Sequence, residues 1–140
     1  MNSSARNQFL GTISTIKQGP INAEVIVTLA GGVKLTSLVT LDSVTELGLA
    51  IGKEVYALVK ASQIILLTDL DMKVTARNNL AGVVKSILQG KVNAEVVLEL
   101  EGGQLLKATV TEEALEEMKI ELGKPLRGVF KANSVLLAIK

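Results

Sequence analysis

Polar and apolar residues alternate along two stretches of the chain, and both stretches end in Gly-Gly. They read NAEVIVTLAGG over 22–32 and NAEVVLELEGG over 93–103. A period of two predicts a half-buried β-strand, and the glycine pair predicts a tight turn after it. The segments VKLTSLVT over 33–40 and LLKATV over 105–110 then supply the returning strands.

The period changes after each returning strand, in TLDSVTELGLAIG (40–52) and TEEALEEMKIELG (111–123). Apolar residues three apart, such as Val44 and Leu47, predict a short helix that a threonine caps and that Gly52 or Gly123 ends. The next segments, KEVYALVKASQIILLT (53–68) and KPLRGVFKANSVLLAI (124–139), each predict two strands joined at Ala-Ser or Ala-Asn.

All these pairs share one register. An offset of 71 positions aligns SARNQFLG at 4–11 with TARNNLAG at 75–82, and the alignment continues to the end without a gap. Self-similarity of this extent indicates a tandem duplication. Strand, strand, strand, short helix, strand, strand is the order of an OB-type barrel. The sequence therefore predicts an all-β protein of two tandem OB-type five-stranded barrels, each with a short helix, over residues 1–69 and 74–140.

The composition of the chain excludes several classes of functional site. Lys and Arg number 15 against 14 Asp and Glu, and the 140 residues include no histidine and no cysteine. Disulfide frameworks, zinc fingers and histidine-based catalytic triads are excluded on that ground. The start of the chain lacks the pattern of a signal peptide, and no apolar run is long enough to cross a bilayer. We expect a soluble cytoplasmic protein that does not bind membranes.

Three further motifs resemble functional sites but do not meet their requirements. GLAIGKE at 48–54 has the wrong glycine spacing for a phosphate-binding loop. Asp69 and Asp71 lack the glycine and distal glutamate of a calcium loop, so they are read as a linker. The acidic residues at 112–117 are read as a solvated helix face rather than an acid–base pair. Because no nucleophile or base constellation remains, we expect the protein not to be an enzyme.

The barrel type raises the alternative that the tandem binds single-stranded nucleic acid. That function needs stacking aromatics beside a cationic groove. The aromatic residues are only Phe9, Tyr56 and Phe130, and none is interleaved with a basic patch. Nucleic acid is therefore the weaker alternative.

Polar donors recur in both halves and suggest a site for a small anion. A hydroxyl where a helix begins, with a lysine nearby, suits a compact anion. Capping, edge-strand and turn roles explain the same residues equally, and the arginines fit a salt bridge or a backbone clamp that holds a swapped strand. The recurring pairs are Ser4/Thr75, Arg6/Arg77, Thr40/Thr111 and Lys60/Lys131.

The segments SARNQFLGTISTIKQGPINAEVIVTLAGG and TARNNLAGVVKSILQGKVNAEVVLELEGG resemble the Mop, or molbindin, domain family, twice over essentially the whole chain. Two-domain members are the nearest match. The resemblance implies a free-standing protein that binds molybdate or tungstate for storage or homeostasis of molybdenum. It implies no other cofactor and no directly ligated metal.

The resemblance also implies which residues bind the oxyanion, between domains. One set is Ser4, Arg6, Thr40, Ser43, Lys60 and Ala61 in the first repeat, with Thr75, Arg77, Thr111, Lys131 and Ala132 in the second. Ser43 is replaced by Ala114 in the second repeat, which removes one donor. A further set, near a symmetry axis, is Ile21, Asn22, Ala23, Val92, Asn93 and Ala94.

Small barrels with apolar residues on more than one face predict self-association. Because family members are arranged around a threefold axis, we expect three chains to form a homotrimer. The expected partners are therefore the oxyanion and other copies of the chain, with no nucleic acid.

Overall fold

The computed structural model describes residues 3–140. The first half contains five strands, one α-helix and one 3-10 turn: β1 (Asn7–Gln18), β2 (Asn22–Leu29), β3 (Lys34–Thr40), α1 (Leu41–Glu46), β4 (Glu54–Val59), η1 (Ala61–Gln63) and β5 (Ile65–Leu67). The second half repeats the order: β6 (Asn78–Gln89), β7 (Asn93–Leu100), β8 (Leu105–Thr111), α2 (Glu112–Glu117), β9 (Pro125–Phe130), η2 (Ala132–Ser134) and β10 (Leu136–Ala138).

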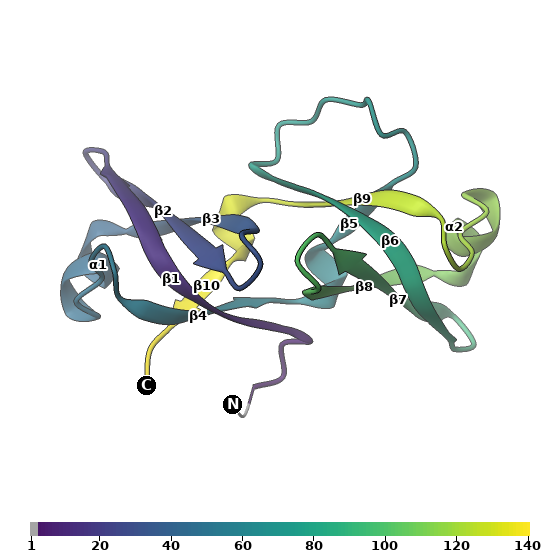
Figure 1. The fold of residues 1–140 in the computed structure, drawn as a ribbon, viewed down its shortest axis with the longest axis horizontal. Coiled ribbons are helices and arrows are strands. Elements are labelled where there is room, and N and C mark those ends of the chain that lie inside the picture. Colours follow the sequence, from purple (N-terminus) through teal and green to yellow (C-terminus); the bar gives the residue numbers. More distant parts are fainter. Residues whose placement is uncertain (1–2) are drawn as a thin grey trace.

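The two halves exchange their last strands. The first sheet has the order β10-β4-β1-β2-β3 and the second has the order β5-β9-β6-β7-β8, with antiparallel pairing throughout. In Figure 1 the yellow C-terminal strand β10 lies beside β4 in the N-terminal half, and teal β5 lies with β9 in the other half. Each sheet is therefore complete only when both halves of the chain are folded.

Each sheet curls because its longest strand is bent. The register of β1 against β2 shifts between Ile13 and Thr15, and that of β6 against β7 shifts between Val84 and Ser86. Such bulges bend a strand and increase its twist. The first part of β1 pairs with β4 and its second part pairs with β2, so one strand serves two neighbours. The predicted class, all-β with two OB-type barrels and a short helix in each, is confirmed.

The core is continuous between the halves. Alternate residues of β2, from Ala23 to Leu29, are buried, as the period of two predicted. The buried cluster also includes Ile64 and Val135, which directly precede the exchanged strands. In addition, the buried Ser37 hydroxyl donates a 2.7 Å hydrogen bond to the Val135 carbonyl. The exchanged strands are thus anchored by apolar burial and by a buried polar contact.

The helices begin as predicted and end sooner. Thr40 and Thr111 are the N-caps, with side chains that accept hydrogen bonds from the backbone N–H groups of Ser43 and Ala114. The expected ends at Gly52 and Gly123 are wrong, because the helices stop at Glu46 and Glu117. A lysine ammonium satisfies the free carbonyls there: Lys53 donates to Leu47 and Gly48, and Lys124 donates to Met118 and Lys119.

The two Gly-Gly turns meet back to back. Gly31 and Gly102 have φ of +89° and +88°, which is the left-handed region that favours glycine. A Cβ on Gly102 would lie 2.7 Å from the Gly31 Cα. The second glycine of each pair, Gly32 or Gly103, also has positive φ but faces open space. The first glycine therefore permits contact between the turns as well as their conformation.

Alanine at Gly102 should destabilise the protein more than alanine at Gly103. Both substitutions carry a conformational cost of about 1–3 kcal/mol, but only Gly102→Ala adds overlap with backbone atoms of the opposite turn. Thermal unfolding of the two variants measures the difference. Equal melting temperatures would show that the turns separate without cost.

Candidate functional site

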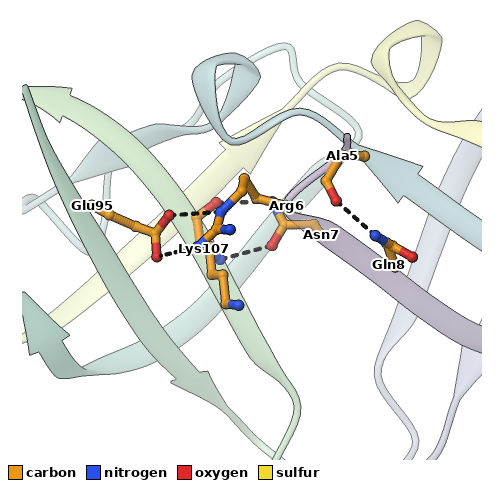
Figure 2. Close-up of polar contacts among 6 residues, drawn as sticks. All are labelled: Ala5, Arg6, Asn7, Gln8, Glu95 and Lys107. Carbon is orange, nitrogen blue, oxygen red and sulfur yellow. Dashed lines mark hydrogen bonds and ion pairs between the residues drawn. The ribbon is translucent and has the colours of Figure 1, made fainter. Parts of the chain in front are cut away.

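The Arg-Asn pair of each repeat contacts the opposite half of the molecule. Figure 2 shows the first pair, Arg6 and Asn7. The Asn7 amide donates to the Lys107 carbonyl and accepts from the Lys107 N–H, both at 2.8 Å. Asn78 makes the same two bonds with Thr36, also at 2.8 Å. Each asparagine is buried and acts as one further rung on the edge strand of the other sheet.

The neighbouring arginines form exposed ion pairs across the same junction. Arg6 donates from Nε and Nη2 to Glu95, at 3.0 and 3.1 Å, whereas Arg77 donates from Nη2 alone to Glu24, at 2.9 Å. The hydrogen bonds to Glu95, followed by the charge of that carboxylate, raise the pKa of Arg6 above its ordinary value. Exposed pairs of this kind add little stability, so the buried asparagines hold the halves together.

A small pocket gathers four of the predicted residues of the second repeat. This Lys131 pocket has a volume of about 180 Å³ and is lined by Leu38, Thr75, Ala76, Arg77, Lys131, Ala132 and Asn133. Its lining holds two cations and one hydroxyl, and no carboxylate belongs to it among residues 3–140. Such a set of donors suits a compact anion.

An adjoining cavity of about 230 Å³ brings in the first repeat. It shares Leu38 and Asn133 with the Lys131 pocket and is also lined by Thr40 and Ser43. The two hydroxyls lie 2.9 Å apart and hydrogen-bond to each other. The exchange brings η2 against β3, so the cavity of Thr40 and Ser43 lies beside the Lys131 pocket, and Lys131 itself lines only the latter.

The corresponding residues of the other repeat line a larger cavity. This Lys60 pocket has a volume of about 430 Å³ and is lined by Ser3, Ser4, Ala5, Leu58, Lys60, Gln63, Asn133, Ser134 and Leu136. It brings Ser4 and Lys60 together, as expected from the sequence. Arg6, Ala61 and Thr111 do not belong to its lining, and Ala61 is buried.

The second predicted set lies where β2 and β7 begin. Asn22 pairs with Thr40 across the sheet, and Asn93 pairs with Thr111. The side chains of Ile21 and Val92 are 74% and 72% exposed, and Ala23 and Ala94 are buried beside them. No cavity among those described combines these residues with the lysine pockets.

Sequence reasoning missed several residues of the junction. Asn7 and Asn78 stand inside the recurring Ala-Arg-Asn motif, so their recurrence was the available signal. Asn133 lines all three cavities, but its counterpart is Ser62 and no repeat pattern marks it. The acceptors of the arginines, Glu24 and Glu95, also recur, within Asn-Ala-Glu-Val, but nothing in one repeat indicates its contact with the other.

Two negative findings hold for residues 3–140. No group of three or more acidic, histidine or cysteine side chains is placed to hold a metal ion. No helix in this range is both long and apolar enough to span a membrane.

A family model described as the TOBE domain matches residues 3–66 and again residues 75–137. A crystal structure of the cytoplasmic molybdate-binding protein ModG, with molybdate bound, superposes with a TM-score of 0.95 at 48% identity and covers all of both chains. The chain is a two-domain molbindin of the TOBE family.

This molbindin also resembles longer curated proteins. It is 40% identical to the molybdenum transport protein ModE of Azotobacter vinelandii, over 99% of this chain and 52% of that protein. It is 37% identical to the molybdenum-pterin-binding protein MopA of Rhodobacter capsulatus, over 99% of this chain and 53% of that protein. The molbindin thus spans about half the length of these relatives.

We call the pair of hydrogen bonds from each of Asn7 and Asn78 to a backbone in the other half an asparagine clamp. Its contribution to stability can be compared with that of the neighbouring Arg77 ion pair. Asn78→Ala should destabilise the molbindin by about 2–4 kcal/mol, because the N–H and C=O of Thr36 lose their partner. Arg77→Ala should change the melting temperature little, since its ion pair is exposed. Thermal unfolding of both variants decides this, and a larger loss from Arg77→Ala would contradict the assignment.

Proposed function

We propose that this protein binds molybdate or tungstate in the cytoplasm and serves to store or buffer the oxyanion, without catalytic activity. The observation that carries the proposal is the convergence of Lys131, Arg77 and Thr75 on one small pocket. Full-length similarity to molybdate-bound ModG supports the same ligand.

The residues proposed to contact the oxyanion are those implied by the family resemblance, but one site combines residues of both repeats. One site combines Thr75, Arg77, Lys131 and Ala132 with Thr40 and Ser43. Its counterpart draws on Ser4, Arg6, Lys60, Ala61 and Thr111. The segments Ile21–Ala23 and Val92–Ala94 are proposed for the axial set.

The donor set suits reversible binding of a dianion. Enclosing molybdate removes its hydration, and this costs free energy unless several donors replace the water. Hydrogen bonds to a charged group are stronger than neutral ones, so a few hydroxyls with one lysine and one arginine are sufficient. The charge of Arg77 is partly neutralised by Glu24, which keeps the affinity moderate, as a buffer requires.

The nucleic-acid alternative loses support from the burial of the aromatic residues. Phe9 and Phe130 are 4% and 1% exposed. Tyr56 is half-buried, and the Lys140 ammonium lies 5.6 Å from the centroid of its ring. Base stacking needs open aromatic faces, which these residues do not offer.

Molybdate should raise the melting temperature through preferential binding to the folded state. At a hundredfold excess over Kd the stabilisation is about 2.7 kcal/mol, equivalent to an increase of roughly 5–10 °C. Equal concentrations of sulfate serve as the control and should give little increase. The Lys60→Ala, Lys131→Ala double variant should fold but lose most of the shift. Equal shifts with sulfate and molybdate would refute the selectivity.

We further propose assembly as a homotrimer, because large apolar side chains such as Ile21, Val92 and Leu88 are more than two-thirds exposed in one chain. Analytical ultracentrifugation should give the mass of three 14.8 kDa chains. Molybdate should stabilise the trimer against dilution if sites form between chains. A monomer that binds molybdate with full affinity would contradict the trimer.

A further inference from the structure

We propose that the two pockets of one chain bind the oxyanion with unequal affinity, that the Lys131 pocket fills first, and that Arg77 determines this order. The inference rests on the proposed function, since it assigns different affinities to the two sites of that function.

The arginines give the first reason. A guanidinium has five N–H donors. Arg6 uses two of its nitrogens on Glu95, and its side chain does not belong to the lining of the Lys60 pocket. Arg77 uses one nitrogen on Glu24 and lines the Lys131 pocket. Arg77 therefore has more donors free, and they are already at the site.

Asn133 contributes to both pockets and does not set their order. It lines the Lys131 pocket, the adjoining Thr40 cavity and the Lys60 pocket. Its counterpart in the first repeat, Ser62, lines none of these three cavities. An amide group supplies two N–H donors where a serine hydroxyl supplies one. Duplication of the chain has thus left a single shared amide between two otherwise related pockets.

Cavity size gives the second reason. The Lys131 pocket has less than half the volume of the Lys60 pocket, so a compact anion there contacts more of the wall. The cavity lined by Thr40 and Ser43 shares Leu38 and Asn133 with the Lys131 pocket, and Asn133 and Leu136 with the Lys60 pocket. This hydroxyl pair therefore does not favour either pocket.

Isothermal titration with molybdate tests the order through a matched pair of variants. Wild type should show two classes of site. Arg77→Ala should weaken the tighter class at least about tenfold, as expected for the loss of a charged donor. Arg6→Ala should weaken the weaker class by a smaller factor than Arg77→Ala weakens the tighter class, because two nitrogens of Arg6 already donate to Glu95. Both variants keep their asparagine clamps, and their melting temperatures check the fold.

A second pair isolates the amide. Asn133→Ser should weaken both classes by roughly threefold to tenfold, whereas Ser62→Asn should leave both unchanged, because residue 62 lines neither pocket. A single class of sites in wild type, or a larger effect from Arg6→Ala than from Arg77→Ala, would overturn the inference while leaving the proposed function in place. Absence of molybdate binding to wild type would instead refute the proposed function.

Discussion

The reciprocal exchange of the last strands is the constraint on which the rest of the structure depends. Neither sheet has its fifth strand without the other half, since β10 pairs with β4 and β5 pairs with β9. A barrel of about seventy residues buries a smaller fraction of its surface than a larger domain does and is marginal alone. Exchange joins two marginal barrels into one cooperative unit with a continuous core, so the halves should fold and unfold together.

The exchange also determines where a site can form. Lys60 and Lys131 directly precede the 3-10 turns that lead into β5 and β10, so each lysine stands where the chain crosses to the other half. The Asn7 and Asn78 clamps lie at the same junction and are buried. In both copies of the Ala-Arg-Asn motif the asparagine holds the halves together and the arginine is exposed, and in the second copy the arginine, Arg77, also lines a pocket. This separation allows the arginine to interact with a ligand without a cost to the fold.

The fold was readable from the sequence because each of its elements is specified locally. Each pattern depends only on residues close together in the chain: the alternation in 22–29 and 93–100, the Gly-Gly turns and the threonine caps. Each of these patterns occurs twice because the chain is duplicated. The helix ends were misjudged because the chain turns left-handed directly after each C-cap, at Gly48 and Lys119, with φ of +60° and +52°. Gly48 is the usual residue for such an end, but Lys119 is not a glycine and gives no such signal. The sequence identified the candidate lysines, hydroxyl residues and arginines one by one. Their grouping was not predictable, because strand exchange places Ser43 near Lys131 through contacts between repeats that no local pattern encodes.

Duplication within one chain has a physical consequence that assembly from identical domains does not have. Two identical domains related by a twofold axis must form equivalent sites, whereas two covalently linked repeats can diverge at one position without changing the other. Ser62 against Asn133, and Ser43 against Ala114, are such positions. The buried clamp residues Asn7 and Asn78 have not diverged, because each must satisfy both backbone groups of an edge-strand residue. Most of the predicted ligand residues have not diverged either, since Arg6 and Arg77, Thr40 and Thr111, and Lys60 and Lys131 are identical pairs. A difference in affinity between the two sites therefore has to come from the few changed positions around the pockets and from the different contacts of identical residues.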